Sequence, residues 1–424
     1  MTKKTLSDIK LRPGQNEREL LLLAEKKLHK KPAYFRILKK SLDARDKDNI
    51  RYVYTIEFSS QKQSEKPSEI PRLPENKLPA APVLIAGSGP AGLFCAIRLL
   101  EHGIRPVVAE RGPCIEQREK KIEKITKTPI LDGEGNIQVG EGGAGTFSDG
   151  KLNTQTHGGF NREVLETFVR FGAPEEILWL NKPHIGSDKL KIVVKNMRSL
   201  IERSGGTVLF DTRLTDIVVR DGKIAGAKLS RGKGAAETID VSAIVLAVGH
   251  SARDTFEMLL SRGIPMRKKD FAVGVRIEHL QSEIGFAQYG KSFSALPPAD
   301  YKLVSHASDR AAFTFCMCPG GFVMPAASEE GGVVTNGMSN YARDGRNANS
   351  ALVVQVSERD FSGDSPLSGI EFQRSLERAA FAAGGNDYSA PVQLVGDFLS
   401  GRESGGFKSV MPTYPAGTRF ADLR

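Results

Sequence analysis

The sequence has few cysteines, a single tryptophan and no long apolar run. Four cysteines in 424 residues exclude a disulfide-stapled secreted fold. No stretch approaches the roughly 18 apolar residues that a membrane-spanning helix needs, and the charged N-terminus lacks the apolar core of a secretory signal. The composition, 40% hydrophobic and 26% charged, is that of a globular protein of two or three domains. We therefore expect a cytoplasmic protein without a membrane span.

The positive charge is concentrated at the N-terminal end. The chain has a net charge of +10, and residues 1–80 hold 19 Lys and Arg against 11 Asp and Glu, a balance of +8. A basic module of this kind can bind RNA, an acidic partner or an anionic surface. A solvated surface explains the same charge more simply, so nucleic acid stays an alternative partner beside a small-molecule substrate.

The patterning divides the chain into four segments. Residues 1–60 combine one helical and two strand-like patterns and predict a small basic α+β module. Five prolines in residues 61–82 predict a stiff linker. A Rossmann-like α/β domain is expected over residues 83–270, where strand and helix patterns alternate, and a mostly antiparallel β domain over residues 271–424.

The most informative segment is the stretch "PVLIAGSGPAGLFCAIRLLEHGIRPVVAE", which predicts strand, tight turn, helix and strand. Gly87, Gly89 and Gly92 form the pattern G-x-G-x-x-G in the structural context that this pattern requires. The first glycine permits the turn, the second lets backbone approach a pyrophosphate, and the third lets helix and strand pack closely. Pro90 and Ala91 then open a helix whose N-terminus favours phosphate, so these five residues predict a dinucleotide site.

An acidic residue ends the second predicted strand. Glu110 lies 18 residues after Gly92, where its carboxylate can accept hydrogen bonds from the hydroxyls of an adenosine ribose. Arg111, beside it, is included in the predicted site. The unit begins the main domain and no second strand–glycine–helix unit follows, so we expect FAD as the bound cofactor, with NAD(P)H at most a transient electron donor.

The loop at residues 139–152, "VGEGGAGTFSDGKL", contains two overlapping phosphate-binding patterns. A dinucleotide motif needs a helix directly after it, and the turn formers that follow Gly145 argue against one. An ATP loop needs Ser or Thr after Lys151, and the residue there is Leu152. Neither pattern is therefore interpreted as a nucleotide site of its own.

Several strings resemble one family. "GEGGAGTFSDGKL", "PHIGSDKL", "AVGHSARDTFEML", "GVRIEH" and "FCMCPGGFVMPA" are similar to a family of uncharacterised bacterial FAD-dependent dehydrogenases within the two-dinucleotide-binding-domain flavoproteins. The resemblance covers nearly the whole chain. It implies a Rossmann-like FAD domain with an inserted, mostly antiparallel substrate domain, and transfer of two electrons or a hydride between FAD and a substrate that it does not identify.

The same resemblance implies further contacts with FAD. The loop residues that it places against the cofactor are Gly142, Gly143, Ala144 and Gly145. It also implies that the backbone at Leu214 meets the adenine and that the strand ending at Gly249 runs toward FAD. Lys151 becomes a candidate for stabilising the reduced flavin.

Acid–base candidates are lone histidines, of which His250 is the best placed; His157 and His184 are the others. The C-x-C pair Cys316 and Cys318 lacks the spacing of a flavin disulfide reductase and is interpreted as incidental, and no metal is expected.

Relatives close the FAD site with a strand that ends in Gly-Asp or Gly-Glu and a helix rich in small residues. The nearest match here is Gly396-Asp397 in "VQLVGDFLSGRESGGF", which no alanine-rich helix follows. We therefore expect a family member without this segment, and an inactive truncated member is an alternative to an active enzyme.

Overall fold

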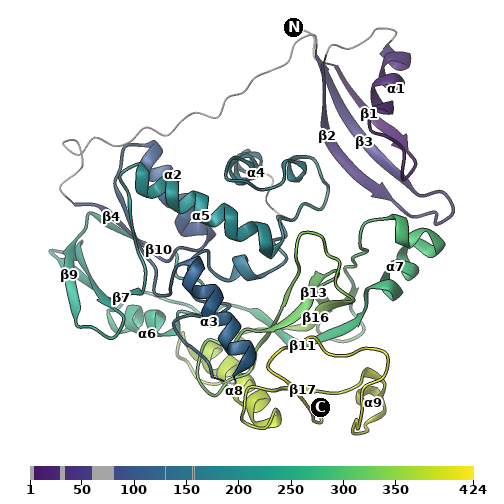
Figure 1. Cartoon of the computed structure of the whole chain (residues 1–424). Helices are drawn as coiled ribbons and strands as arrows, with labels where there is room; N and C mark the ends of the chain where they lie inside the picture. Colours follow the sequence, from purple (N-terminus) through teal and green to yellow (C-terminus); the bar gives the residue numbers. More distant parts are fainter. Residues whose placement is uncertain (1–3, 29–33, 60–80, 129, 155, 157) are drawn as a thin grey trace.

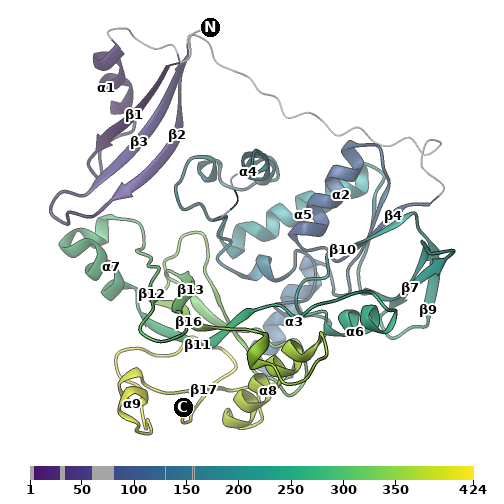
Figure 2. The same cartoon turned by 180° about the vertical axis from the view of Figure 1, so that it is seen from behind.

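Figure 1 shows a computed structural model of the chain, which describes residues 4–28, 34–59, 81–128, 130–154, 156 and 158–424. Nearly all of the predicted linker, and His157, fall outside these residues, so the predictions for them stay predictions. Three bodies of structure are visible: a small sheet near the N-terminus, a domain around a parallel sheet, and an antiparallel domain that carries the C-terminus (Figures 1 and 2).

The small sheet is antiparallel, in the order β1-β3-β2, and one helix packs on it. Its elements are β1 (Lys4–Leu11), α1 (Glu19–Leu28), β2 (Tyr34–Asp43) and β3 (Arg51–Ser59). The predicted helix and two strands are present, but β1 was not predicted. Its only buried residues are Ile9 and Leu11 near its end, so it lacks the apolar alternation that identifies a strand in sequence.

The edge strand β2 joins the small sheet to the rest of the protein. The Lys40 N–H donates to the Trp179 carbonyl at 2.8 Å, and the Asn181 N–H donates to the Lys40 carbonyl at 3.0 Å. This short parallel bridge uses backbone groups that would otherwise be unpaired at the sheet edge.

The main domain is built on a four-stranded parallel sheet in the order β10-β4-β5-β6. The strands are β4 (Val83–Ala86), β5 (Pro106–Ala109), β6 (Thr207–Leu209) and β10 (Ala243–Leu246). Leu84 and Ile85 are fully buried on opposite faces of the sheet, as expected for a strand covered on both sides.

Helices cover one face of this sheet and an antiparallel meander covers the other. The helices are α2 (Pro90–Glu101), α4 (Phe160–Arg170) and α5 (Ser187–Arg203), and the meander strands are β7 (Thr212–Arg220), β8 (Lys223–Arg231) and β9 (Ala236–Asp240). The predicted turn at Asp221-Gly222 joins β7 to β8, and both residues have positive φ, 51° and 72°. These are the dihedral signs of the hairpin turn that Asp-Gly favours.

The second domain is centred on an antiparallel sheet in the order β11-β16-β13-β12. Its strands are β11 (Phe271–Leu280), β12 (Val304–Ser305), β13 (Ala312–Cys318) and β16 (Asn347–Val356). Around it lie α7 (Gln281–Tyr289), β14 (Phe322–Pro325), β15 (Thr335–Met338), α8 (Ser368–Ala383), β17 (Ala390–Val392) and β18 (Thr418–Phe420). The predicted fold class, a Rossmann-like domain with a mostly antiparallel second domain, is confirmed.

Gly396-Asp397, the nearest match in the sequence to a strand that ends in Gly-Asp, does not lie at the end of a strand. Both residues lie inside the short helix α9 (Val395–Ser400), after β17 has ended at Val392. Asp397 instead stabilises the segment after α9, because its carboxylate accepts hydrogen bonds from the side chains of Arg402 and Ser404. Among the described residues there is no helix with the length and apolar character that a membrane crossing requires.

Candidate functional site

The turn between β4 and α2 has the geometry that its three glycines predict. Gly87 has φ +104°, and a Cβ there would lie 2.4 Å from the Ala247 carbonyl oxygen. A Cβ on Gly92 would lie 2.0 Å from the Gly87 carbonyl oxygen, so both positions exclude a side chain. A Cβ on Gly89 would meet only the Gly143 Cα, at 3.9 Å. The turn is therefore tightly packed at Gly87 and Gly92 and open at Gly89, which is the geometry that a dinucleotide-binding turn requires.

The open side of the turn faces the N-terminus of α2. Gly89 is the N-cap, Pro90 is the first helical residue, and no side chain caps the helix. Pro90 and Ala91 are exposed. Free N–H groups and the positive end of the helix dipole are thus available to an anion, as predicted from the sequence.

Glu110 is buried and is oriented by the glycine turn. Its Oε2 accepts hydrogen bonds from the Ser88 N–H at 2.9 Å and the Ser88 hydroxyl at 2.7 Å, and its Oε1 accepts one from the Gly112 N–H at 2.9 Å. A carboxylate oxygen can accept two hydrogen bonds, so Oε1 keeps capacity for one hydroxyl donor. This is the capacity that a ribose hydroxyl needs.

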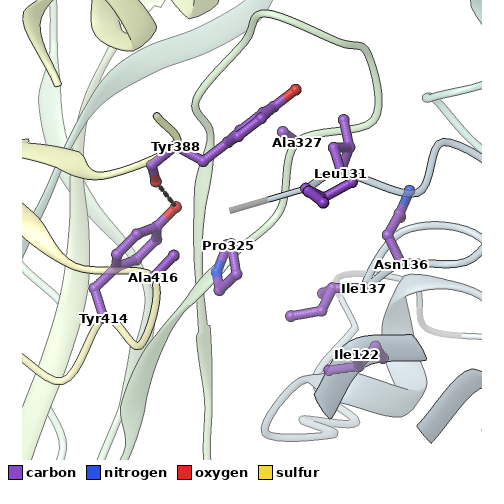
Figure 3. Close-up of a pocket in the computed structure, with 10 residues that line it drawn as sticks. Ile122, Leu131, Asn136, Ile137, Pro325, Ala327, Tyr388, Tyr414 and Ala416 are labelled. Atoms are coloured by element: carbon purple, nitrogen blue, oxygen red, sulfur yellow. Dashed lines mark hydrogen bonds between the residues drawn. The ribbon is translucent and has the colours of Figure 1, made fainter. Parts of the chain in front are cut away.

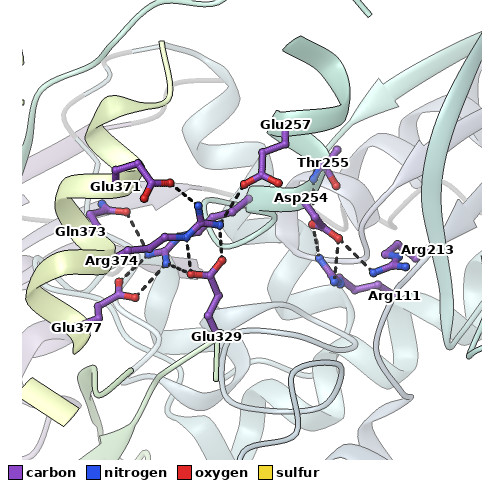
Figure 4. A network of polar contacts seen from close by, with 11 residues as sticks. Arg111, Arg213, Asp254, Thr255, Glu257, Glu329, Glu371, Gln373, Arg374 and Glu377 are labelled. Atoms are coloured by element: carbon purple, nitrogen blue, oxygen red, sulfur yellow. Dashed lines mark hydrogen bonds and ion pairs between the residues drawn. The ribbon is translucent and has the colours of Figure 1, made fainter. Parts of the chain in front are cut away.

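Arg111 is differently placed. Its guanidinium donates to Glu134 at 2.8 and 2.9 Å, and Arg213 also pairs with Glu134. It donates to Asp254 at 2.9 and 3.3 Å, and Arg213 shares that carboxylate too (Figure 4). Cofactor binding by Arg111 stays a prediction. Its side chain would have to contact the cofactor while it keeps its ion pairs with Glu134 and Asp254.

The glycine loop that was predicted to contact FAD lies against the turn. The Gly142 N–H donates to the Ser88 carbonyl at 3.0 Å. A Cβ on Gly143 would lie 3.2 Å from the Gly89 Cα, and one on Gly145 would lie 3.8 Å from Pro90. Ala144 begins the short 3₁₀ helix η2 (Ala144–Phe147), and the residues described between η2 and α4 form no α-helix. The tertiary structure thus brings the two glycine segments together at the start of α2.

A buried arginine that the sequence did not indicate holds this loop. Arg118, on α3 (Ile115–Lys127), is fully buried, and its guanidinium lies 4.7 Å from the Phe147 ring centroid. It donates hydrogen bonds to five loop carbonyls, those of Asn136, Ile137, Gly140, Glu141 and Gly143. Burial lowers the pKa of Arg118 to about 10. In "IEQREKKIEKITK" this residue is one charge among many, so no sequence signal could have identified it.

Glu141, in the same loop, connects it to the start of α3. Its side chain is fully buried, and its Oε2 accepts a hydrogen bond from the Ile115 N–H at 2.8 Å. Its Oε1 has no hydrogen-bond partner, and the Arg198 Nε lies 3.3 Å away. Burial raises the pKa of Glu141 to about 7, although Arg198 and the Ile115 N–H both favour the charged form.

The strand predicted to end at Gly249 ends three residues earlier, because β10 stops at Leu246. Ala247, which follows β10, makes the close contact with Gly87, and Gly249 has φ +71°. Leu214 has its side chain in the core between the parallel sheet and the meander, so only its backbone could meet an adenine. His250 is exposed, with its ring 3.2 Å from the Ser251 hydroxyl.

Lys151 lies where the loop meets the second domain. Its Nζ is 2.8 Å from Asp149 and 3.8 Å from the Cys318 Sγ of β13. Asp149 is buried and is also paired with Arg343, so these two cations hold its pKa below the ordinary value despite burial. His184 lies beside Lys151 in a β-bridge. The structure therefore brings Lys151, His184 and Cys318 to one region and leaves His250 outside it.

Ion pairs fix the helix that follows Gly249 to the second domain. Arg253 begins α6 (Arg253–Ser261) and is 6% exposed. It donates to Glu329 at 2.5 Å and to Glu377 of α8 at 2.6 Å. Arg374 of α8 also binds Glu329 (Figure 4). Glu329 has a pKa of about 2, because Arg374 and Arg253 both donate to it.

A small apolar pocket lies between α3 and the second domain (Figure 3). Ile122 and Ile137 face Pro325 and Tyr414 across it, and the Tyr414 hydroxyl donates to the Tyr388 carbonyl at 3.2 Å. The pocket adjoins the loop that Arg118 holds. Within the described residues there is no grouping of three or more His, Cys, Asp and Glu suited to a metal ion.

The parallel sheet, the glycine turn and the acid at the end of β5 define a Rossmann-type dinucleotide-binding domain. Residues 270–424 match the family described as "FAD-dependent protein, C-terminal domain-like", and residues 2–59 match a domain of unknown function. An uncharacterised protein of Clostridium beijerinckii is 45% identical over 407 residues, which are 92% of this chain and 75% of the clostridial protein. The chain belongs to the same family as this protein, and its residues 270–424 carry the domain described for FAD-dependent proteins.

Two solved structures are similar over part of their length. Glycerol-3-phosphate dehydrogenase from Bacillus halodurans, complexed with FAD, is 13% identical, with a TM-score of 0.33 over 71% of this chain and 52% of the dehydrogenase. A geranylgeranyl bacteriochlorophyll reductase-like protein from Thermoplasma acidophilum is 15% identical, with a TM-score of 0.32 over 72% of this chain and 62% of the reductase. This chain thus spans less than two thirds of either protein, and scores this low assign nothing further to it.

Proposed function

We propose that the protein is a FAD-dependent oxidoreductase that passes two electrons or a hydride between FAD and a small-molecule substrate. The observation that carries the proposal is the convergence of two glycine segments and a buried acid at the N-terminus of α2. The Gly87–Gly92 turn, the Gly142–Gly145 loop and Glu110 meet there, and a side chain at Gly89 would fill the open side.

The residues present fit FAD. The turn at Gly89 and the free N–H groups of α2 would hold the pyrophosphate, and the free acceptor capacity of Glu110 would take a ribose hydroxyl. The Gly142–Gly145 loop would pass along the cofactor, with Arg118 fixing its carbonyls away from it. When bound, FAD supplies the redox chemistry, and these residues bind and orient it.

Lys151 is the residue that we assign to the reduced state of the cofactor. It lies six residues beyond Gly145, at the junction with the second domain, and its side chain is 26% exposed. Asp149 is shared with Arg343, so the ammonium retains part of its charge for a second anion. A cation there would stabilise negative charge on the reduced cofactor. NADH or NADPH would act as a transient donor.

The absorption spectrum of the purified protein tests the proposal. We expect a flavin spectrum with about one FAD per chain, which is bleached when NADH or NADPH is added without oxygen. Colourless protein that added FAD does not stabilise against heat would contradict the proposal.

The role of Lys151 is tested with Lys151→Met. We expect unchanged FAD content, a more negative midpoint potential of the bound FAD and reduction slowed about tenfold or more. Lys302→Met, at an exposed lysine before β12, is the matched control. If the two variants have the same potential, Lys151 does not act on the cofactor.

A further inference from the structure

A group of hydrogen-bond donors lies on the sheet face of the second domain that meets Lys151. Arg276 of β11 donates from its NH1 group to the Asn349 Oδ1 of β16 at 2.5 Å and to the Cys316 carbonyl at 3.4 Å. Gly337 of β15 lies directly against the group, because a Cβ there would be 2.4 Å from Arg276, 2.4 Å from Asn349 and 2.8 Å from the Cys318 sulfur. Cys318 in turn lies next to Lys151, so the donors and the ammonium form one cluster.

Two donors in this cluster have no acceptor. The Nε of Arg276 and the Nδ2 of Asn349 are both buried without a hydrogen-bond partner, and Asn349 is fully buried. The orientation of the Asn349 amide is determined by Arg276, since the guanidinium must face its oxygen. A buried donor left unpaired costs about 1–3 kcal/mol, so a pair of them in one place indicates a missing acceptor.

The charge of the cluster is not balanced. Burial lowers the pKa of Arg276, and among the described residues its guanidinium donates to a carbonyl and an amide oxygen, not to a carboxylate. The nearby carboxylates already have other hydrogen-bond or ion-pair partners. Asp149 is shared by Lys151 and Arg343, and Glu278, two residues along β11, accepts hydrogen bonds from Thr413 and Asn347. Thr413 and Asn347 are neutral, so the charge of Glu278 favours the charged form of Arg276. Three cations then face two carboxylates, which leaves one excess positive charge beside the unmet donors.

An exposed aromatic ring adjoins the cluster. Arg276 and Phe315 are both paired with Ala351 in the sheet, one from each side, so the three side chains lie in a row on one face. Phe315 is 59% exposed, a large apolar surface on a strand that pairs with β16. The site therefore presents cationic donors on one side and an apolar surface next to them.

We propose that Arg276 and Asn349 bind the carboxylate of the substrate, and that Phe315 contacts the apolar body of the same molecule. The substrate is thus a carboxylic acid with an aromatic or aliphatic group. A guanidinium and an amide N–H suit the two oxygens of a carboxylate, and both unpaired donors are satisfied when it binds. This inference rests on the proposed function, because it assigns the substrate class of the same FAD-dependent site.

The test uses benzoate as the probe and benzamide, which has the same shape without the charge, as its control. Binding is measured by calorimetry and by the change in the visible spectrum of the FAD-bound full-length protein. We expect saturable binding of benzoate, with benzamide and acetate at least about tenfold weaker, a difference of about 1.4 kcal/mol.

Two variants remove the site in different ways. Arg276→Gln removes the charge, and Asn349→Asp places the protein's own carboxylate beside Arg276. Both are expected to weaken benzoate at least about tenfold with unchanged FAD content. Lys302→Gln, at an exposed lysine, should bind benzoate like the wild type.

Each outcome decides the inference. Stoichiometric FAD without benzoate binding, or equal binding of benzoate and benzamide, overturns the carboxylate site and leaves the proposed function intact. If Arg276→Gln loses FAD, the guanidinium serves the cofactor and the inference is also overturned. If the wild type binds no FAD, the proposed function fails. Calorimetry of benzoate with the cofactor-free wild type and the two variants then tests the anion site separately: binding that both variants weaken supports the site, and no binding overturns it.

Discussion

The buried carboxyl of Glu141 makes the stability of the protein dependent on pH. Its pKa in the folded protein is about 7, because burial disfavours the charged form, whereas the ordinary value is 4.5. Between these two values the folded protein retains the proton and the unfolded chain has lost it. The contribution of Glu141 to the free energy of unfolding therefore falls as pH rises from about 4.5 to about 7. Above pH 7 this contribution is constant.

The size of the effect follows from the two pKa values. Each pH unit between them contributes about 1.36 kcal/mol, so the free energy of unfolding falls by about 3 kcal/mol across the range. Glu141→Gln removes the charge and keeps an oxygen that can accept the Ile115 N–H bond. The variant should be within about 1 kcal/mol of the wild type at pH 5 and more stable by up to about 3 kcal/mol at pH 8.

The measurement is urea unfolding followed by circular dichroism at several pH values, for the wild type, Glu141→Gln and Glu237→Gln. Glu237 lies exposed on β9 and provides the matched control. If the difference between Glu141→Gln and the wild type is the same at pH 5 and pH 8, the carboxyl does not titrate in the folded protein and the reasoning is refuted.

Three further substitutions test the framework of the site. Gly92→Ala places a methyl group 2.0 Å from the Gly87 carbonyl oxygen and should abolish FAD retention, whereas Gly396→Ala, with nothing within 4 Å, should retain FAD; absorbance at 450 nm distinguishes them. Arg118→Met leaves five loop carbonyls without their donor and should destabilise the protein by about 3 kcal/mol in urea unfolding, and a stable variant would show that the loop does not need the guanidinium. Arg253→Met separates α6 from α8 at the two carboxylates and should cost about 2 kcal/mol in the same assay; no change would mean that the ion pairs do not hold the domains together.

The tight glycine turn between β4 and α2 could be predicted from the sequence because its signal is local. Gly87, Gly89 and Gly92 lie within six residues and follow a strand whose apolar residues are contiguous, so the turn, the helix and the open side follow from backbone sterics alone. The α/β class and the antiparallel second domain were predictable for the same reason, since strand and helix patterns are short-range. Strand β1 escaped prediction because only two of its residues are buried.

Only the tertiary structure decided which distant residues form the site. Arg118 binds carbonyls up to 25 residues away, and Lys151 lies 167 residues from Cys318 in sequence. The unpaired donors of Arg276 and Asn349 exist only because β11 and β16 are neighbours in one sheet. Hydrogen bonding and desolvation depend on what surrounds a group in space. The sequence by itself therefore determined the glycine turn, while packing determined the support of the loop by Arg118, the burial of Glu141 and the proposed carboxylate site.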